Sequence, residues 1–423
     1  MAAAEPGSHV DAITRLVPCG RESWGCEEGV MVVQPSDFAP FDAAPDDGPW
    51  TMDDLLRANK ESLVLPYCVE YERQALIFVE TPRQAALQDA LVYNAQRKYA
   101  QRVWLVPLEH VRRFVDRRLD EDPAQAENIL FVQSTGRCGS TLLSKVLDAI
   151  GGVHSLSEPD VYTQIWDTVL AGREALSGVN THQLLHDVTV LYAMMLRFHS
   201  AGDDLVCLKL RSQCIEVAES MHKAIPSAKQ IFMYRDGIET VDSFAQAFIR
   251  VLPKPVQMAA SLGLEGFALR ASPVYPLLER FAIPIREGRL GLWAWVWYGF
   301  HGLMACVWLG SMEAAAAASD KGILCCNVKY EHFVAERGRY VRRILEAIGY
   351  KRLPEMAAFE TEQVNQIFGK DAHAGGLVEG GRAFNKQTLV QKGPSEYRRA
   401  GIETIVQTGT VVNTTSAVLP GTL

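Results

Sequence analysis

The chain has 423 residues, of which 48% are hydrophobic and 22% are charged. This composition is typical of a globular protein that buries one large core or two unequal ones. The 42 basic and 50 acidic residues give a formal net charge of −8, which supplies no general attraction for nucleic acid or anionic lipid. Any anion-binding site must therefore be local. The nine cysteines have no CxxC spacing, which argues against a disulfide framework and against a zinc site.

The sequence predicts neither a secretory signal nor an N-terminal membrane anchor, because its first twenty residues contain no basic stretch followed by an apolar core. We therefore expect a cytoplasmic protein. Residues 290–312 carry no charge if His301 is neutral, and this segment is long enough to span a bilayer. Its large side chains recur every three to four positions with small residues between them, which favours a buried globular helix over a transmembrane one.

The chain begins with a segment of low order and then changes character twice. Residues 1–50 are rich in Pro, Gly, Asp and Ala and predict a loosely ordered lead-in. Two β-prone runs within 63–80, then a helix, a short strand at 103–106 and another helix, predict a small α+β appendage over residues 51–124. Residues 401–423 lack clear periodicity, and we expect them to form a peripheral tail.

Between these parts, apolar runs alternate with helical stretches. Buried strands between helices predict an α/β domain over residues 125–400, with three layers and a central parallel sheet of the phosphate-loop nucleotide-binding type. Residues 250–289 contain five prolines and are expected to be irregular, either as a lid or substrate-facing wall or as a surface loop. The expected strands of the sheet are residues 129–132, 205–210, 230–234 and 322–328.

A glycine-containing turn follows the first of these strands. Residues 134–141 read STGRCGST and lead directly into an amphipathic helix. Gly136 and Gly139 permit a tight turn, and the helix N-terminus adds free N–H groups and its positive dipole end, so the loop is suited to hold an anion. It departs from G-x-x-x-x-G-K-[ST] because Ser140 stands in the place of the lysine, which disfavours ATP or GTP hydrolysis. The alternative is a simple turn between a strand and a helix.

A second cluster lies at the end of the strand at 230–234, where Arg235 is followed by Asp236 and Gly237, with Ser243 on the next helix. Arg235 offers a rigid fork of donors, and Ser243 offers a hydroxyl about two helical turns further on. The alternative is a surface arginine in an ion pair, with Asp236 as a possible partner.

Taken together, these motifs resemble the sulfotransferases that use 3′-phosphoadenosine 5′-phosphosulfate (PAPS), over residues 128–349. Arg137 before the CGST core is similar to the protein-tyrosine and carbohydrate branches, although no membrane anchor of their kind is expected here. The stretch at 327–334 is similar to the family's Tyr-Glu-x-Leu/Phe-Val motif, in which Tyr330 either faces the nucleotide or belongs to the core. The resemblance implies PAPS as co-substrate, no required metal, and nucleotide contacts from Gly136, Arg137, Cys138, Gly139, Ser140, Thr141, Arg235, Ser243 and Tyr330.

The resemblance also suggests residues for the chemistry. Glu158 is the candidate general base, because its spacing from Arg137 is similar to that of the catalytic glutamate in the protein-tyrosine branch and Pro159 favours an extended, exposed backbone. Its alternative role is a carboxylate that orders the loop. His154 is the second candidate, since its ordinary pKa suits proton transfer near neutrality.

Lys209 lies at the end of the second expected strand, at the edge where a parallel sheet presents ligands, and could neutralise charge on the departing phosphate together with Arg137. Arg211 is the alternative cation, and a solvated strand-end lysine is the alternative role for Lys209. A basic, glycine-punctuated segment at 375–393 either closes over the nucleotide or is a surface loop.

The expected activity is transfer of a sulfuryl group from PAPS to a hydroxyl of a small molecule, carbohydrate or peptide. A phosphate-loop small-molecule kinase and a non-catalytic nucleotide-binding protein remain alternatives. The fold and the donor site do not determine the acceptor.

Overall fold

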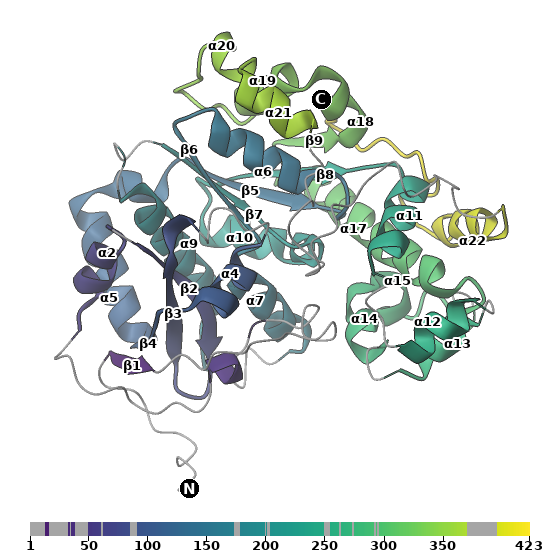
Figure 1. The fold of residues 1–423 in the computed structure, drawn as a ribbon, viewed down its shortest axis with the longest axis horizontal. Helices are drawn as coiled ribbons and strands as arrows, with labels where there is room; N and C mark the ends of the chain where they lie inside the picture. Colours follow the sequence, from purple (N-terminus) through teal and green to yellow (C-terminus); the bar gives the residue numbers. More distant parts are fainter. Residues whose placement is uncertain are drawn as a thin grey trace, which may run out of the picture.

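The computed structural model describes residues 13–16, 33, 35–38, 50–60, 62–84, 91–172, 178–198, 200, 204–248, 254–261, 264–272, 275–291, 293, 296–369 and 396–423. Within them the chain forms two sheets, a five-stranded sheet in order β6-β7-β5-β8-β9 and a four-stranded sheet in order β1-β4-β3-β2. Figure 1 shows the four-stranded sheet beside the larger α/β layers.

The five-stranded sheet is parallel throughout, as the alternation of apolar runs and helices predicts. Its central strand β5 is buried along its whole length, which fits a strand covered on both faces. The edge strand β6 is not among the strands expected from the sequence. The strands are β5 (Ile129–Ser134), β6 (Val153–Ser157), β7 (Leu205–Lys209), β8 (Lys229–Tyr234) and β9 (Cys326–Lys329).

Helices cover both faces of this sheet, so the predicted three-layer α/β class is confirmed. Because successive side chains of a strand point to opposite faces, Leu130 and Val132 join the core under α6 and α19, whereas Ile129 and Phe131 join the core with α7 and α9. The helices of these two layers and their connections are α6 (Ser140–Ala149), α7 (Val161–Leu170), α9 (Thr181–Arg197), η3 (Ser212–Val217), α10 (Ala218–Ala224), α18 (Tyr330–Glu336), α19 (Gly338–Ala347), α20 (Met356–Phe359) and α21 (Glu362–Gly369).

The four-stranded sheet is antiparallel and, with its helices, confirms the predicted N-terminal α+β appendage, here called the N-terminal unit. Strand β1 lies inside the predicted lead-in of residues 1–50, so the described part of that lead-in adds an edge strand to the sheet. The elements of the unit are β1 (Thr14–Leu16), η1 (Pro35–Phe38), α2 (Met52–Ala58), β2 (Ser62–Glu70), β3 (Ala75–Pro82), α4 (Val92–Tyr99), β4 (Arg102–Pro107), α5 (Leu108–Glu121) and η2 (Pro123–Ala126).

The apolar segment predicted at 290–312 is observed as helix α17 (Gly299–Asp320). It is the one described helix whose length and composition would suit a membrane span, and 78% of its most apolar window is buried inside the protein. Its neighbour α11 (Gly237–Phe248) packs beside it, which agrees with the expected globular helix. The predicted helix is interrupted, because residues 297–298 form a turn and Gly299, at the start of α17, adopts a left-handed φ of 60°. Before this turn, Trp293 and Val296 are helical as well. Trp293 and Trp297 are exposed.

The proline-rich segment at 250–289 contains four short helices instead of the expected irregular chain. Three of its prolines occupy the second position of a helix, where a missing N–H costs nothing because that group has no partner within the helix. Sequence reasoning treated these prolines as breakers, whereas they start helices. The helices are α12 (Lys254–Ser261), α13 (Glu265–Arg270), α14 (Tyr275–Phe281) and α15 (Ile283–Arg286).

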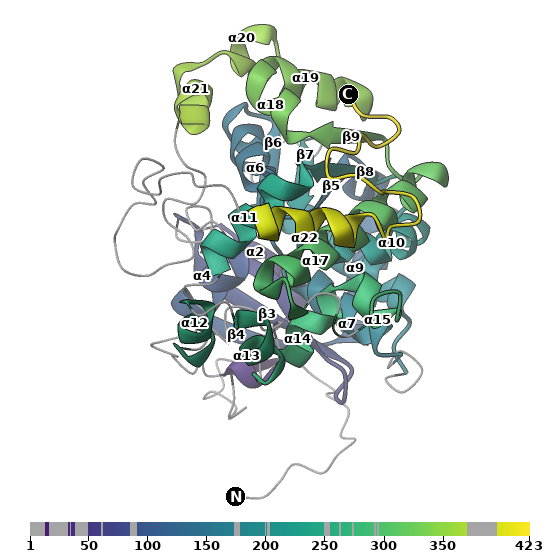
Figure 2. The same cartoon turned by 90° about the vertical axis from the view of Figure 1, so that its right-hand side faces the viewer.

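The C-terminal residues are not peripheral, in contrast to the expected tail after residue 400. Helix α22 (Glu396–Val406) buries Ile402 and Ile405 against α17, and Figure 2 shows it crossing that helix. The following residues reach the free edge of β9, where Asn327 donates to the carbonyl of Gly421 over 3.0 Å and accepts from the amide of Leu423 over 3.0 Å. Short amphipathic segments that bury few residues leave little periodicity to read.

Candidate functional site

The predicted site residues gather at one edge of the parallel sheet. The carboxyl ends of β5, β6, β7, β8 and β9 lead directly to the loop at 135–139, Glu158, Leu210, Arg235 and Tyr330, respectively. After β5 the chain forms β6 and β7 on one side of this strand and then β8 and β9 on its other side. The order in which strands are added therefore reverses at β5. Ligands of open parallel sheets bind at this kind of switch point.

The loop between β5 and α6 has the backbone of an anion cradle. Gly136, Arg137 and Gly139 all have left-handed φ values, of 75°, 53° and 79°. Alternation between left-handed and right-handed residues turns successive N–H groups toward one side of the chain. Gly139 is the N-cap of α6 and makes no side-chain cap, so the first-turn N–H groups are not satisfied by the helix itself. The local sequence therefore builds an anion-binding concavity.

Close neighbours leave no room for a side chain at either loop glycine. A Cβ atom at Gly136 would lie 2.6 Å from the ring of Phe244 on α11, and one at Gly139 would lie 2.8 Å from the ring of Tyr330. The loop is thus pressed between α11 and the start of α18. In the same contact, Arg137 Nε donates to Ser243 Oγ over 3.0 Å, which joins two predicted site residues from distant parts of the chain.

Arg235 lies on the other side of Tyr330. Its guanidinium carbon is 4.7 Å from the centre of the Tyr330 ring, and its Nη2 pairs with Glu239, not with the adjacent Asp236. Its Nε is buried without a hydrogen-bond partner among the described residues. An orphaned arginine donor beside an exposed ion pair is a site at which an anion can bind, because an exposed pair contributes only about 0–1 kcal/mol.

Cys138 faces the core instead of the cradle. Its Sγ lies 3.3 Å from the carbonyl of Met233 on β8, and burial raises the pKa of this thiol. Ser140 and Thr141 are buried as well. The Cys138 thiol therefore serves packing and not the cradle.

Glu158 and Lys209 form an ion pair between the ends of β6 and β7. Lys209 Nζ pairs with Glu158 Oε1, and only 5% and 16% of these side chains are exposed. The Glu158 amide also donates to the Lys209 carbonyl over 2.6 Å. Glu158 has a φ of 55°, a conformation that costs a non-glycine residue about 1–2 kcal/mol. Strained backbone of this kind concentrates at functional sites.

Arg211, the alternative cation, approaches Glu158 from a second direction. Its Nε is 3.6 Å from Glu158 Oε2 and 2.7 Å from Asp160 Oδ1. His154 is separated from this group, because it lies four residues before Glu158 on the same strand and its Nε2 is 3.2 Å from Asp204. At about 3.3 Å per strand residue, His154 is about 13 Å from the ligand edge.

Asp160 and Tyr93 complete the surroundings of Glu158 and were not predicted. Asp160 is fully buried and its Oδ2 accepts a hydrogen bond from Arg211 Nη2 over 3.0 Å, while Tyr93 of α4 stacks its ring 4.3 Å from the Arg211 guanidinium carbon. Burial raises the pKa of Asp160. The spacing contained a signal for Asp160, because Glu158 and Asp160 repeat the two-residue separation of Lys209 and Arg211 on the neighbouring strand end. No local signal marks Tyr93.

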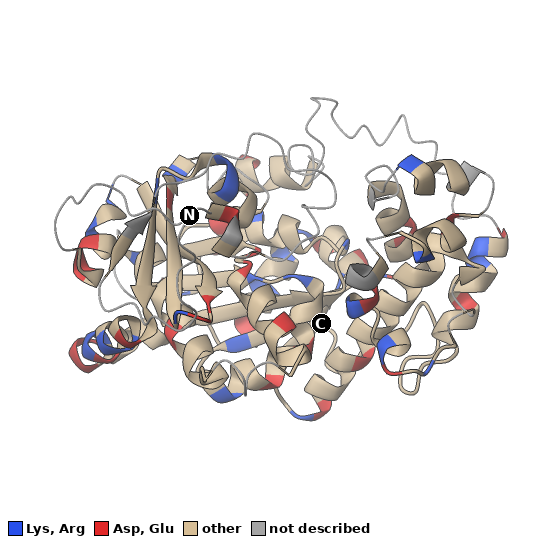
Figure 3. Ribbon diagram, turned by 90° about the horizontal axis from the view of Figure 1, so that it is seen from below, with Lys and Arg blue, Asp and Glu red and all other residues tan. Residues whose placement is uncertain are grey.

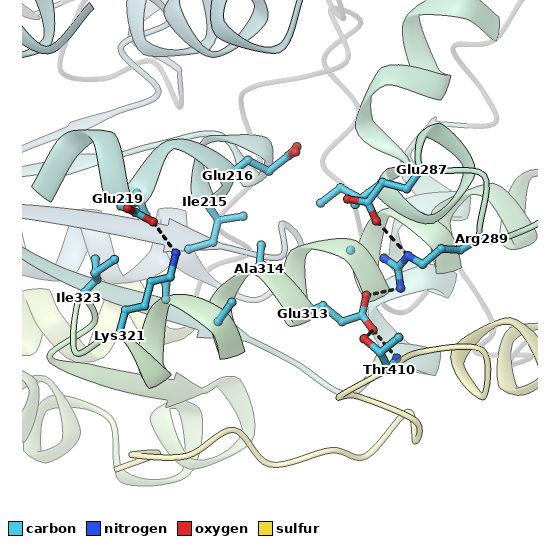
Figure 4. Close-up of a pocket in the computed structure, with 15 residues that line it drawn as sticks. Ile215, Glu216, Glu219, Glu287, Arg289, Glu313, Ala314, Lys321, Ile323 and Thr410 are labelled. Carbon is cyan, nitrogen blue, oxygen red and sulfur yellow. Dashed lines mark hydrogen bonds and ion pairs between the residues drawn. The ribbon is translucent and has the colours of Figure 1, made fainter. Parts of the chain in front are cut away.

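A cavity of about 440 Å³ lies elsewhere, between η3, α15 and α17, and none of the predicted site residues lines it. Figure 4 shows its charged groups paired with one another: Lys321 with Glu219, and Arg289 with both Glu287 and Glu313. In the view of Figure 3, basic and acidic positions are interspersed along the described elements. The candidate site differs from the cavity in bringing together cations from separate strand ends at the sheet edge.

Two further predictions concern parts of this edge. The glycine-punctuated segment at 375–393 lies outside the described residues. Among the described residues, no group of three or more His, Cys, Asp or Glu side chains is arranged to hold a metal ion.

The comparisons with known proteins gave structural similarities alone. No family model matches the chain, and no curated protein matches it. Solved structures that resemble it include a sulfotransferase from Alicyclobacillus acidocaldarius, at 13% identity over 57% of this chain and 88% of that one, with a TM-score of 0.29. The sulfotransferase domain from the curacin biosynthetic pathway has 12% identity over 70% of this chain and 99% of that one, with a TM-score of 0.36.

A third similar structure is a sulfotransferase from Mycobacterium avium, at 14% identity over 77% of this chain and 88% of that one, with a TM-score of 0.36. With every TM-score below 0.5, these similarities do not establish the activity of this chain. The case for its function rests on its own residues.

Proposed function

We propose that this protein is a sulfotransferase that transfers a sulfuryl group from PAPS to a hydroxyl group of its acceptor. The observation that carries the proposal is the convergence at one sheet edge of an anion cradle, an arginine with an unpaired donor, and a buried carboxylate–lysine pair. A nucleotide with phosphate groups at two positions needs two separate anion sites, and this edge offers both.

The residues present fit such a nucleotide. The N–H groups of 136–141 and the Arg137 side chain are suited to the 5′-phosphosulfate, because they combine a helix N-terminus with a fixed charge. Arg235 and Ser243 are suited to the 3′-phosphate. Arg235 would exchange its exposed ion pair with Glu239 for a doubly charged phosphate. The Tyr330 ring, which packs against the Arg235 guanidinium, would keep that guanidinium in place.

The reacting groups would meet beside Glu158 and Lys209. When bound, the nucleotide supplies a sulfuryl group whose bond to the 5′-phosphate oxygen breaks as a bond to the acceptor oxygen forms. Glu158 takes the proton of the acceptor hydroxyl. Lys209, at the end of the strand next to the cradle, stabilises the negative charge that collects on the departing phosphate. The protein thus promotes the transfer by positioning the reacting groups and by stabilising the charge that develops on them.

The acid–base role of Glu158 can be tested by replacing it with Gln. This Glu158→Gln variant keeps the shape of the side chain but cannot accept the proton, so we expect turnover with labelled PAPS to fall by about 10² to 10⁴ while the affinity for 3′-phosphoadenosine 5′-phosphate stays nearly unchanged. The assay needs an acceptor found by screening phenols, sterols, sugars and peptides. The matched control is His154→Gln, for which we expect unchanged turnover. Unchanged turnover in Glu158→Gln would remove Glu158 as the base.

Donor identity separates this proposal from a small-molecule kinase. Calorimetry should give tighter binding of 3′-phosphoadenosine 5′-phosphate than of ATP with magnesium, because Arg235 and Ser243 contact a phosphate that ATP lacks. Arg235→Gln should remove this preference. Tighter binding of ATP that depends on magnesium would support the kinase instead. Nucleotide binding without label transfer to any acceptor of the panel would indicate a binding protein.

A further inference from the structure

The buried pair of Asp160 and Arg211 lies next to the proposed base and has no part in the function described so far. Arg211 donates one hydrogen bond to Asp160, from Nη2 to Oδ2 over 3.0 Å. Its Nε makes ion-pair contacts of 2.7 Å to Asp160 Oδ1 and 3.6 Å to Glu158 Oε2. Lys209 holds the other oxygen of Glu158. Both carboxylate oxygens of Glu158 therefore face cations, but the second cation is shared with another carboxylate.

The N-terminal unit holds this pair in place. The ring of Tyr93 covers the Arg211 guanidinium at 4.3 Å, and the amide of Val33 donates to Asp160 Oδ2 over 3.1 Å. Behind Tyr93, Arg97 pairs with Asp37 at 3.2 Å and donates to Tyr67 over 2.8 Å. Asp160 is fully buried, so its charge is weakly screened by solvent and acts strongly on nearby groups.

We propose that Asp160 and Arg211 are positioning residues for Glu158: Arg211 orients its second oxygen, and Asp160 moderates the positive charge that Arg211 presents to it. The inference rests on the proposed function in taking Glu158 as the base. It also gives the N-terminal unit a role in the site, because Tyr93 and Val33 come from that unit and its preceding segment. Without Asp160, the positive charge of Arg211 would be less neutralised and would stabilise the Glu158 carboxylate more strongly. Glu158 would then be a poorer proton acceptor.

Opposite charge changes at this pair should move the titration of Glu158 in opposite directions. Among the described residues, the titratable and charged groups that interact with Glu158 include Lys209, Arg211, Tyr93 and Cys214, and Asp160 acts through its contact with Arg211. Asp160→Asn leaves Arg211 unneutralised and should lower the titration midpoint of Glu158, whereas Arg211→Gln removes the cation and should raise it. A charge change within about 4–6 Å shifts such a midpoint by about 1 unit or more.

The midpoint can be measured without nucleotide by carbon NMR of the full chain labelled at its glutamate carboxyl carbons, with Glu158→Gln assigning the signal. We expect the midpoints to increase in the order Asp160→Asn, wild type, Arg211→Gln. The titration midpoint of Glu158 in the double variant should be higher than in the wild type. The double variant also allows the test if a single variant fails to fold, because replacing a buried pair as a whole is tolerated better than breaking it. Equal midpoints, or shifts of both single variants in one direction, would overturn the inference.

Activity provides a second, separable readout. The acidic limb of the pH profile of kcat/KM should follow the same order as the NMR midpoints. Glu80→Gln is the matched control, because Glu80 is a buried carboxylate that pairs with Arg102 in the N-terminal sheet, remote from Glu158. It should lower stability without moving the limb. If the wild type transfers no sulfuryl group, the proposed function fails while the NMR order still decides this inference.

Discussion

At the scale of single residues, the proposed anion site depends on the conformation of the loop at 136–139. Gly136 and Gly139 combine a left-handed backbone with a neighbour that would collide with a side chain. The φ value raises the energy of any other residue by about 1–2 kcal/mol, and the collision displaces Phe244 or Tyr330. These two effects differ in their consequences, because the second one would also disturb the proposed nucleotide contacts.

Replacing Gly139 by Ala should therefore lower nucleotide affinity as well as stability. The new methyl group would push the Tyr330 ring, and with it Arg235, away from the cradle. We expect stability to fall by about 1–2 kcal/mol and the Kd for 3′-phosphoadenosine 5′-phosphate to rise at least about tenfold, measured by calorimetry; a tenfold change corresponds to about 1.4 kcal/mol.

Gly151 supplies the control for this change. Its φ of 76° is nearly the same, but a Cβ atom there would meet nothing within 4 Å. Gly151→Ala should lower stability by a similar amount and leave the nucleotide affinity unchanged. A similar loss of affinity in both variants would mean that Tyr330 plays no part in shaping the cradle.

At the scale of elements, the C-terminal segment 409–423 stabilises the outer side of the sheet. It buries Val412 and Leu419 in the core around α17. It also supplies the carbonyl of Leu423 to the Tyr340 hydroxyl over 2.6 Å and bonds the free edge of β9. An open sheet edge with unpaired N–H and C=O groups would otherwise face solvent.

Removing residues 409–423 should lower the free energy of unfolding by about 3–6 kcal/mol, because two apolar side chains each lose about 1.5–3 kcal/mol of burial. Denaturant titration would measure it. Two adjacent valines provide a finer comparison, since Val412 is buried and Val411 is 65% exposed. Val412→Ala should cost about 2 kcal/mol and Val411→Ala less than about 0.5 kcal/mol. Equal effects would contradict the packing described for this segment.

At the scale of the whole molecule, the N-terminal unit and the α/β layers share one core. Leu65, Leu76 and Trp104 of the antiparallel sheet belong to the same buried cluster as Phe131 of β5 and Leu191 of α9. Direct bonds cross the same boundary, including Tyr192 Oη to the carbonyl of Pro66 over 2.6 Å. A continuous apolar core couples the stabilities of the parts that contribute to it.

We therefore expect the two sheets to unfold together. Leu76→Ala in the N-terminal sheet and Leu191→Ala in α9 should each cost about 2–5 kcal/mol and should lower the same single transition in scanning calorimetry. Two transitions, with only one of them shifted by each variant, would contradict this coupling.

The layered α/β class and the candidate loop could be read from the sequence because both are local or periodic properties. A buried strand, a glycine turn and an amphipathic helix follow one another within residues 129–149, and each is specified by neighbours a few positions away. The same holds for Arg235 directly after β8 and for Lys209 at the end of β7. The boundaries of the domains stay a prediction, and the starts of helices near Gly299 and near the prolines of 250–289 depended on backbone details that periodicity does not reveal.

What surrounds these residues was decided by tertiary structure alone. Strand order brought Glu158 beside Lys209 and left His154 about 13 Å behind it. Packing of α11 and α18 against the loop joined Arg137 to Ser243 and Tyr330 to Arg235. Tyr93 reaches Arg211 across more than a hundred residues of chain, and no spacing encodes such a contact. The sequence by itself thus determined which side chains stand at strand ends, whereas the order of strands in the sheet and the packing of the N-terminal unit determined which of them meet.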